Sequence, residues 1–434
     1  MEIEIICTGD EVLGGKIVNS NFAYVSLKLE DFGLSVRRET TVGDNREDLL
    51  EAFRVAGERA DVVIVNGGLG PTVDDLSQEV AAEAAGVPLE LNTDWLEQMR
   101  RFFLSRGRKM PDNNTKQAML PQGAELIDNP VGTACGFAVN IGRARFYFTP
   151  GVPRELHRML EAEIIPRLLG GEGAKGVIRL RRFHSFGLGE SHVDSMLAGI
   201  EALVPDGSVK LGFRAHYPQL ETKLTIHAKD DAEVEQKVAP VVAEVRRRLG
   251  NFILAEGDQT LEGVIVDALA KQGRTLAVVE DFTGGQVSAR IAPLPQARDL
   301  LLRGSVVPSG KAKGELFGTD VWPGGDPQEL LPEHAEVLAT AARQQSGAEI
   351  GLAVLCTLAP AQGGRGQAGN LTGTVCVAVA DGDKLHSQRS HLTGNRDWVR
   401  LGATEMALDG FRRVLQGLPI KERTDFDTYP ADNN

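Results

Sequence analysis

The chain has 434 residues, of which 42% are apolar and 25% are charged, a composition typical of a soluble globular protein. This length exceeds what one hydrophobic core usually serves, so about two or three domains are expected. The 47 basic and 60 acidic residues give a net charge of −13. That balance argues against general affinity for nucleic acid or anionic membranes, because both need clustered Lys and Arg.

The cysteines and the hydrophobic segments favour a cytoplasmic location. Cys7, Cys135, Cys356 and Cys376 are scattered and form no CxxC or Cys/His cluster, which is typical of free thiols in a reducing compartment. The N-terminus lacks the basic segment of a signal peptide. No stretch approaches the roughly 18 uninterrupted apolar residues of a membrane-spanning helix. We therefore expect a cytoplasmic protein that binds neither membrane nor nucleic acid.

Residues 2 to 168 alternate between strand-like and helix-like patterns. Strand patterns at 2–9, 35–43 and 61–68 are each followed by a helix pattern, and a last strand at 143–151 precedes a helix near Pro153. This alternation predicts βαβ units and a mostly parallel sheet. Ligands of such folds bind beyond the carboxyl ends of the strands, so we expect the loops there to form a site.

The patterns in the rest of the chain predict further, smaller domains. The Gly-rich segment 168–176 is typical of a linker, and the stretch up to about 255 has the mixed patterns of an α+β unit. From Gln259 a third α/β unit begins, with a Gly-rich loop at 361–370 between two strands. The predicted organisation is residues 1–170, 171–256 and 257–420 as domains, and 421–434 as a flexible polar tail.

The stretch NGGLGPTVDD, residues 66–75, directly follows a buried apolar strand. Gly67, Gly68 and Gly70 allow close backbone approach, so that N–H groups can point at an anion beside the start of the next helix. Asp74 and Asp75 have two interpretations. They cap that helix in the first of its turns, or at least one of them binds a divalent cation that offsets repulsion between acid and phosphate. This segment alone does not decide between them.

Other polar loops fall at the same predicted edge of the sheet. The polar residues of each loop have an alternative structural role, mainly capping of a helix. Several such loops at one edge nevertheless favour a metal–phosphate site. The two Asn side chains at 19 and 21 suit ribose hydroxyls or a base. The candidates in these loops are Asp10, Asn19, Asn21, Asp44, Asn129 and Thr133.

These loops resemble, in order over residues 1–170, the signature segments of the N-terminal domain of the CinA family. The segments are GDEVLGGKIVNSN, VGDN, NGGLGPTVDD, NPVGTACGF and TPGVPRE. That domain is similar to the molybdopterin-binding domains of MogA and MoeA, and FGLGES at 186–191 resembles the linking domain of the family. The resemblance implies a three-layer α/β/α N-terminal domain, a small α+β middle domain and a C-terminal α/β domain of CinA type.

The resemblance also implies an activity, the hydrolysis of ADP-ribose to AMP and ribose 5-phosphate by a metal-dependent pyrophosphatase. The loop Gly67–Thr72 would cradle phosphate, and Asp10, Asp44, Asp74 and Asp75 would supply metal-binding and water-orienting carboxylates; we choose Asp75 as the base. A divalent ion (Mg²⁺, Co²⁺ or Mn²⁺) is implied, with K⁺ as a further candidate, and so is a homodimer. The alternatives are a protein that binds a pterin or transfers adenylate to it, and a DNA-binding competence protein, against which the net charge argues.

The third unit resembles the C-terminal CinA domain, whose active members deamidate nicotinamide mononucleotide. Their motif Ala-Glu-Ser-x-Thr-Gly-Gly is matched by VVEDFTGG, which places Asp281 at the nucleophilic Ser. A family segment containing Tyr is replaced by VVPSGKAKGE, and a Gly-rich segment by CTLAPAQGG. We predict that this domain keeps the fold but not the deamidase activity; the alternative is that the altered site still works.

Overall fold

The structure, a computed structural model, describes residues 1–170, 177–318, 330–360, 371–422 and 424–425. The described residues pack into two compact units. The first unit consists of Met1–Arg179 and His227–Asp231, and the second of Leu180–Ile226 and Ala232–Asn434. The expected Gly-rich loop at 361–370 lies outside the described residues.

The first unit is built on a sheet with strand order β2-β1-β3-β8-β7-β6. The strands are β1 (Ile3–Thr8), β2 (Val36–Val42), β3 (Val62–Asn66), β6 (Glu125–Ile127), β7 (Gly136–Ile141) and β8 (Ala144–Thr149), and a separate pair is formed by β4 (Leu89–Leu91) and β5 (Met119–Pro121). β2, β1, β3 and β8 run parallel, and β7 and β6 continue the sheet antiparallel. The predicted mostly parallel sheet is therefore confirmed.

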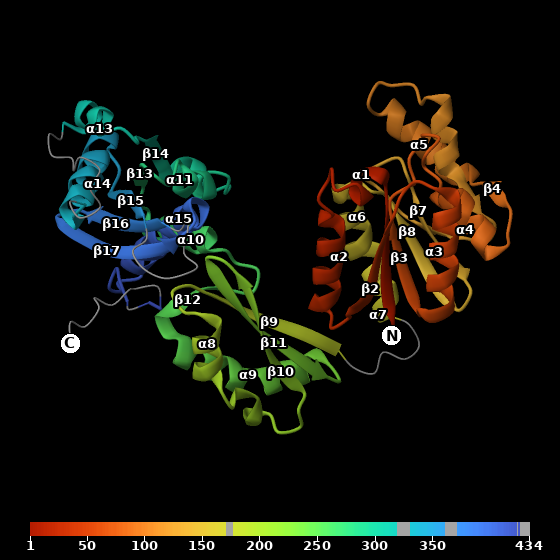
Figure 1. Ribbon diagram of the computed structural model, residues 1–434, viewed down its shortest axis with the longest axis horizontal. Coiled ribbons are helices and arrows are strands. Elements are labelled where there is room, and N and C mark those ends of the chain that lie inside the picture. Colours follow the sequence, from red (N-terminus) through yellow and green to blue (C-terminus); the bar gives the residue numbers. More distant parts are fainter. Residues whose placement is uncertain (171–176, 319–329, 361–370, 423, 426–434) are drawn as a thin grey trace. The chain divides into compact units, whose positions relative to one another are not determined.

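Helices cover both faces of this sheet, which gives three layers (Figure 1). One face packs on α2 (Ser20–Asp31), α6 (Pro153–Met159), the π-helical turn Leu160–Ile164 and α7 (Ile165–Leu169). The other packs on α3 (Arg46–Arg59), α4 (Ser77–Ala85) and α5 (Thr93–Leu104). The short α1 (Asp10–Leu13) and the 3₁₀-helix Asp112–Ala118 lie in the connections. Buried apolar strands between two helical layers are the expected arrangement for a parallel sheet.

The middle of the chain forms a sheet with strand order β10-β11-β9-β12. Its elements are β9 (Val177–Ser185), α8 (Glu190–Leu197), the 3₁₀-helix Ile200–Leu203, β10 (Val209–His216), β11 (Gln219–Ala228), α9 (Asp231–Leu249), the 3₁₀-helix Gly250–Phe252 and β12 (Ile253–Glu256). α9 buries one stripe of valines, Val234, Val238, Val241 and Val245, whose helical spacing gives the helix one apolar face. These elements have the mixed α+β content that the sequence patterns predict for this stretch, and its bounds as a separate domain stay a prediction.

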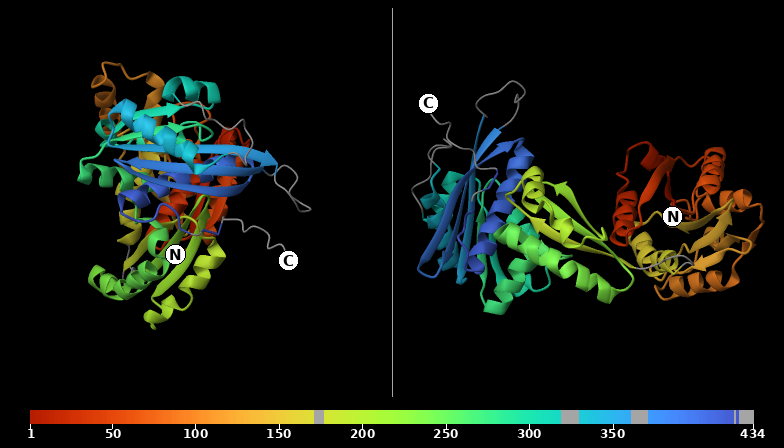
Figure 2. Two further views of the ribbon diagram at one scale, coloured as in Figure 1. Left: turned by 90° about the vertical axis from the view of Figure 1, so that its left-hand side faces the viewer. Right: turned by 90° about the horizontal axis from the view of Figure 1, so that it is seen from below.

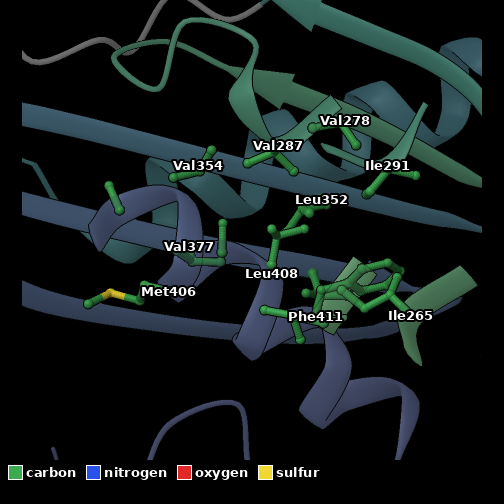
Figure 3. Close-up of a cluster of buried hydrophobic side chains, with 14 of the residues drawn as sticks. Ile265, Val278, Val287, Ile291, Leu352, Val354, Val377, Met406, Leu408 and Phe411 are labelled. Carbon is green, nitrogen blue, oxygen red and sulfur yellow. The ribbon is translucent and has the colours of Figure 1, made fainter. Parts of the chain in front are cut away.

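The C-terminal part is a second three-layer arrangement on a sheet ordered β14-β13-β15-β16-β17. Its elements are α10 (Leu261–Gln272), β13 (Leu276–Glu280), α11 (Gln286–Ile291), α12 (Ala297–Leu300), β14 (Leu301–Val306), α13 (Gly310–Phe317), α14 (Pro332–Ser346), β15 (Ile350–Pro360), β16 (Leu371–Asp381), β17 (Lys384–Gly394) and α15 (Arg396–Leu415). Helices lie on both faces (Figure 2). On one face Phe411 and Leu408 of α15 pack with Ile265 of α10 and Leu352 of β15 (Figure 3).

The described residues at the start of the predicted tail, 421–434, make hydrogen bonds to other parts of the chain. Arg413 donates to Glu422 Oε2 at 2.7 Å, and Lys421 Nζ donates to the Arg389 carbonyl at 3.2 Å. Asp425 accepts from the Gly189 N–H at 2.7 Å. Arg423 and residues 426–434 lie outside the described residues. In the described part of the chain no helix has the length and hydropathy to span a membrane.

Candidate functional site

A pocket of about 400 Å³ lies at the carboxyl ends of the parallel strands of the first unit. The ends of these strands are tied to one another, since Gly9 N–H donates to the Val42 carbonyl at 3.1 Å and Gly67 N–H to the Thr149 carbonyl at 2.9 Å. The walls of the pocket come from the segments that follow β1, β2, β3 and β8, from the segment before β7 and from the 3₁₀-helix Asp112–Ala118. The lining residues are Thr8, Gly9, Glu11, Asp44, Gly67, Gly68, Leu69, Gly70, Pro71, Asp74, Asp75, Gln117, Thr133, Ala134, Pro150, Gly151, Val152 and Glu155.

The structure brings together some of the residues proposed from sequence and not others. Those lining the pocket are Gly67, Gly68, Gly70, Asp44, Asp74, Asp75 and Thr133. Those outside its lining are Asp10, Asn19, Asn21, Thr72 and Asn129. In the second group, Asp10 begins α1 and Asn21 lies in the first turn of α2. Asn19, Thr72 and Asn129 lie in the connecting segments. The contacts of all five support the segments around the pocket.

The glycine loop after β3 is tightly packed against Thr8. Gly67 and Gly68 have φ values of +114° and +68°, which L side chains rarely adopt. A Cβ at Gly67 would stand 2.5 Å from Thr8 Oγ1, and one at Gly68 would stand 2.4 Å from Ser77 Oγ. A side chain at either position would therefore strain the loop and displace its neighbour. Thr8 is 6% exposed, and among the described residues its hydroxyl has no hydrogen-bond partner, an unusual state for a buried polar group.

Side chains from outside the loop fix its backbone by hydrogen bonds to three of its carbonyl groups. Ser77 Oγ donates to the Gly67 carbonyl at 2.9 Å, and Gln117 Nε2 donates to the Leu69 carbonyl at 3.1 Å. Lys116 Nζ donates to the Thr72 carbonyl at 3.0 Å. These three hydrogen bonds from outside the loop stabilise its observed conformation.

Asp74 and Asp75 do not lie in the first turn of α4, where the sequence places them. The helix begins at Ser77 after Leu76, and the two acids belong to a turn that precedes it. Asp75 Oδ2 accepts from the Thr72 N–H at 2.8 Å and from the Thr72 hydroxyl at 2.5 Å, so that this acid stabilises the turn itself. The pKa of Asp74 lies below its usual value, because the Thr72 side chain, the Asp74 backbone N–H and the charge of Lys116 all favour its ionised form.

The loops after β1 and β2 are joined through their acids. Asp10 N–H donates to Asp44 Oδ2 at 3.2 Å, and Asp44 N–H donates to Asp10 Oδ1 at 3.1 Å. Burial raises the pKa of Asp44, and repulsion from Asp10, Glu11 and Asp74 adds to this increase, while the hydrogen bond from the Asp10 backbone opposes it. Asn45, and not Asp44, caps α3 by accepting from the Asp48 N–H. Asp44 is thus an acid held close to other acids.

The candidate asparagines act as supports. Asn19 takes its plainer role and caps α2 by accepting from the Phe22 N–H. Asn21 is buried and donates to Asn66 Oδ1 and to the Gly151 carbonyl, both at 2.8 Å. Neither side chain lines the pocket, so their direct contact with ribose or base stays a prediction.

A metal ion would find oxygen ligands here but no complete set of protein ligands. In the parts of the chain that are described, no three His, Cys, Asp or Glu side chains are grouped closely enough to hold a metal ion. Asp44, Asp74 and Asp75 nevertheless line one pocket, and the pKa of Asp44 responds to Asp74. Mg²⁺ usually binds through one or two carboxylates together with waters and substrate phosphates, and these donors fit that pattern.

Sequence reasoning missed several of the lining residues. Thr8, Glu11, Gln117 and Glu155 all face the pocket. The rule that predicted the other loops applies to Glu155, because this residue follows β8, a further parallel strand that ends at the same edge. No comparable signal marks Gln117, which reaches the loop from the 3₁₀-helix Asp112–Ala118.

At the second family-like site, the C-terminal one, Asp281 follows β13 and is buried in an ion pair. Lys313 Nζ donates to Asp281 Oδ2 at 3.1 Å, and the side chains are 1% and 7% exposed. Asp281 also accepts from the Cys356 N–H at 3.0 Å and from the Phe282 N–H. The preceding Glu280 accepts four hydrogen bonds, one from Thr283 before α11 and three from Val287 and Ser288 in the first turn of α11. Both acids are therefore neutralised or satisfied within the protein.

Comparison with known proteins assigns each part of the chain to a domain family. Residues 4–170 match the family described as "Probable molybdopterin binding domain", residues 180–255 match "Damage-inducible protein CinA KH domain", and residues 258–415 match "CinA C-terminal domain". The domains occur in the order that the sequence motifs predict.

Similar proteins match over almost the whole length. The CinA-like protein of Shewanella loihica is 37% identical over 431 residues, which cover 99% of each chain. That of Geotalea uraniireducens is 35% identical over 432 residues, which cover 98% of this chain and 100% of its relative. A solved structure, CinA with unknown function from Thermoplasma acidophilum, is 35% identical, covers 38% of this chain and 96% of its own, and has a TM-score of 0.36. With its domains in family order and relatives of this identity over their full length, the chain belongs to the CinA family, as its sequence motifs predict.

Proposed function

We propose that the N-terminal pocket hydrolyses the pyrophosphate bond of ADP-ribose, with a divalent metal ion, and releases AMP and ribose 5-phosphate. The observation that carries this proposal is the composition of the pocket, in which a fixed glycine loop and an unpartnered buried hydroxyl lie beside several carboxylates. Hydrolysis of a pyrophosphate requires donors for the non-bridging oxygens, neutralisation of charge and an oriented water. The pocket offers protein groups for each requirement.

The glycine loop is the part that suits phosphate. Gly67 and Gly68 bring the backbone against Thr8 without side chains in between, so that a non-bridging oxygen can approach the loop closely. The Thr8 hydroxyl can donate to that oxygen, which would give this buried group the partner it otherwise lacks. Ser77 and Gln117 donate to the Gly67 and Leu69 carbonyls, which keeps these carbonyl oxygens directed away from the phosphate.

The acids suit a metal ion carried together with the phosphates. Asp44, Asp74 and Asp75 would hold it, and Asp10 would position Asp44 through their paired hydrogen bonds. A bound divalent cation neutralises phosphate charge and polarises the P–O bonds. The same cation would relieve the repulsion that raises the pKa of Asp44. We expect Mg²⁺, Co²⁺ or Mn²⁺, with K⁺ as a further candidate, in a cytoplasmic homodimer.

Binding of a pterin, or transfer of adenylate to it, is the second candidate function. The match of residues 4–170 to a family described as a probable molybdopterin binding domain favours it. Both candidates need a phosphate cradle, so the glycine loop alone does not separate them. For the C-terminal domain we propose a structural or ligand-sensing role without deamidase activity, because the acid at the position of the nucleophile is engaged by Lys313.

The test is incubation of the purified full-length protein with ADP-ribose and Mg²⁺ or Co²⁺. We expect AMP and ribose 5-phosphate in equal amounts, loss of both with a chelator, and recovery when metal is added back. Asp74→Asn should lower turnover, whereas Asp94→Asn, an exposed acid in the first turn of α5, should not. Absence of AMP with every metal would refute the proposal, and adenylate transfer to a pterin would replace it. Nicotinamide mononucleotide should yield no ammonia.

A further inference from the structure

Glu155 stands apart from the other acids of the pocket. It comes from the first turn of α6, whereas Glu11, Asp44, Asp74 and Asp75 come from the loops after β1, β2 and β3. Repulsion between acids acts on Asp44. The main influences on Glu155 are instead burial, the amide of Asn129 and the charge of Arg154. Glu155 is therefore a separate carboxylate that faces the same cavity.

The carboxylate of Glu155 is fixed in one orientation. Asn129 Nδ2 donates to Glu155 Oε2 at 2.6 Å and to the Ala134 carbonyl at 2.7 Å. Asn129 is itself 1% exposed and accepts from the Val131 N–H at 3.3 Å. The backbone at Gly132 packs so closely that a Cβ there would stand 2.0 Å from Oε2. The hydrogen bond from Asn129 goes to Oε2 of Glu155, which leaves Oε1 able to accept a proton.

We propose that Glu155 is the general base of the hydrolysis, and that it takes the proton of the attacking water. This inference rests on the proposed function. In the step, the water oxygen forms a bond to one phosphorus of ADP-ribose, and the bond from that phosphorus to the bridging oxygen breaks. The bridging oxygen leaves with the electron pair as an oxygen of the other phosphate. Glu155 accepts one proton from the water and later releases it to solvent.

The other acids of the pocket are less suited to this task. Asp75 Oδ2 already accepts two hydrogen bonds from Thr72. The pKa of Asp74 is lowered, which makes it a weaker base, and Asp44 lies among other acids. Burial raises the pKa of Glu155, although Asn129 and Arg154 oppose this effect. A raised pKa moves a carboxylate toward the working pH of a general base. We therefore assign the base to Glu155 in place of Asp75, our choice from sequence.

The experiment compares Glu155→Gln, Glu155→Asp and Arg154→Gln with the wild-type protein, using ADP-ribose and Mg²⁺. In Glu155→Gln the side-chain oxygen can still accept from Asn129, so thermal unfolding should be unchanged. We expect kcat to fall by about 10²- to 10⁴-fold with little change in KM, and Glu155→Asp to retain part of the activity. Glu161→Gln is the matched control. It removes an acid that lies outside the pocket and accepts a hydrogen bond from Tyr24, so this variant should keep wild-type kcat.

The pH dependence of kcat separates a base from a merely structural group. Activity should fall on the acid side as Glu155 becomes protonated. Arg154→Gln removes an exposed positive charge that lowers the pKa of Glu155, so this acid limb should move to higher pH. Wild-type kcat in Glu155→Gln, or an acid limb unmoved in Arg154→Gln, would overturn the assignment while leaving the pyrophosphatase proposal intact. A wild-type protein that forms no AMP would refute both.

Discussion

The loops after β3 and β13 share a local design and differ in what surrounds them. Each follows a buried parallel strand, contains two glycines with positive φ and leads into a helix. After β3 the acids face a pocket, and the Thr8 hydroxyl beside the glycines has no partner among the described residues. After β13 the acid is buried against Lys313. A shared motif therefore does not indicate a shared role, because the charges around it decide whether a ligand has anything to bind.

The largest effect is expected from breaking the buried pair with Lys313→Met. Removing one partner of a buried ion pair typically costs about 3–5 kcal/mol, since the remaining charge is left uncompensated. We expect a loss of this size in the free energy of unfolding, measured with urea at pH 7. Lys311→Met, which changes an exposed lysine on the same helix, should alter it by less than about 0.5 kcal/mol.

The loss in Lys313→Met should also depend on pH. Burial raises the pKa of Asp281, and without the charge and hydrogen bond of Lys313 only the backbone N–H groups of Phe282 and Cys356 oppose this increase. Protonation then favours the folded state, so the deficit relative to wild type should shrink as the pH falls and grow as the pH rises. Unfolding measured at pH 5 and at pH 8 checks the sign, and a deficit that grows toward acid pH would contradict the account.

Substitution of Asp75, in the loop after β3, should reduce activity much more than stability, the reverse of what we expect for Lys313→Met. Asp75→Asn removes a charge from the pocket but keeps an oxygen that can accept from the Thr72 N–H. We expect ADP-ribose turnover to fall by about 10²-fold or more, with a change in unfolding free energy below about 0.5 kcal/mol. Steady-state kinetics and urea unfolding of the same preparation provide the two values. A large loss of stability with full activity would mean that Asp75 only shapes the turn.

The smallest effects should come from a matched pair of glycine substitutions, Gly68→Ala and Gly285→Ala. Both glycines have positive φ, at +68° and +93°, so each alanine should cost about 1–2 kcal/mol of stability. Gly68→Ala also forces Ser77 Oγ to move and should lower turnover by about tenfold. The new methyl group in Gly285→Ala would contact Val306, and this variant should leave turnover unchanged. Equal turnover in the two variants would remove the distinction between the loops.

Much of the first unit could be predicted from its sequence because its signals are local. The apolar strands and the helices between them fix a parallel sheet, and a parallel sheet gathers its loops at one edge. The turn that holds Asp75 could not be predicted, because its hydrogen bonds with Thr72 compete with an earlier start of α4. The pair of Asp281 with Lys313, and that of Asn129 with Glu155, join residues far apart in the chain, and no local pattern records such contacts.

The buried pair after β13 limits which single substitutions the C-terminal domain can tolerate. A single change of Asp281 to serine would leave the Lys313 ammonium buried without its carboxylate, at a cost large relative to the total stability of a domain. The effects of the two positions are therefore coupled. A chain with serine at position 281 and Lys313 retained should therefore be less stable than this one, and a change at Lys313 should alter that difference.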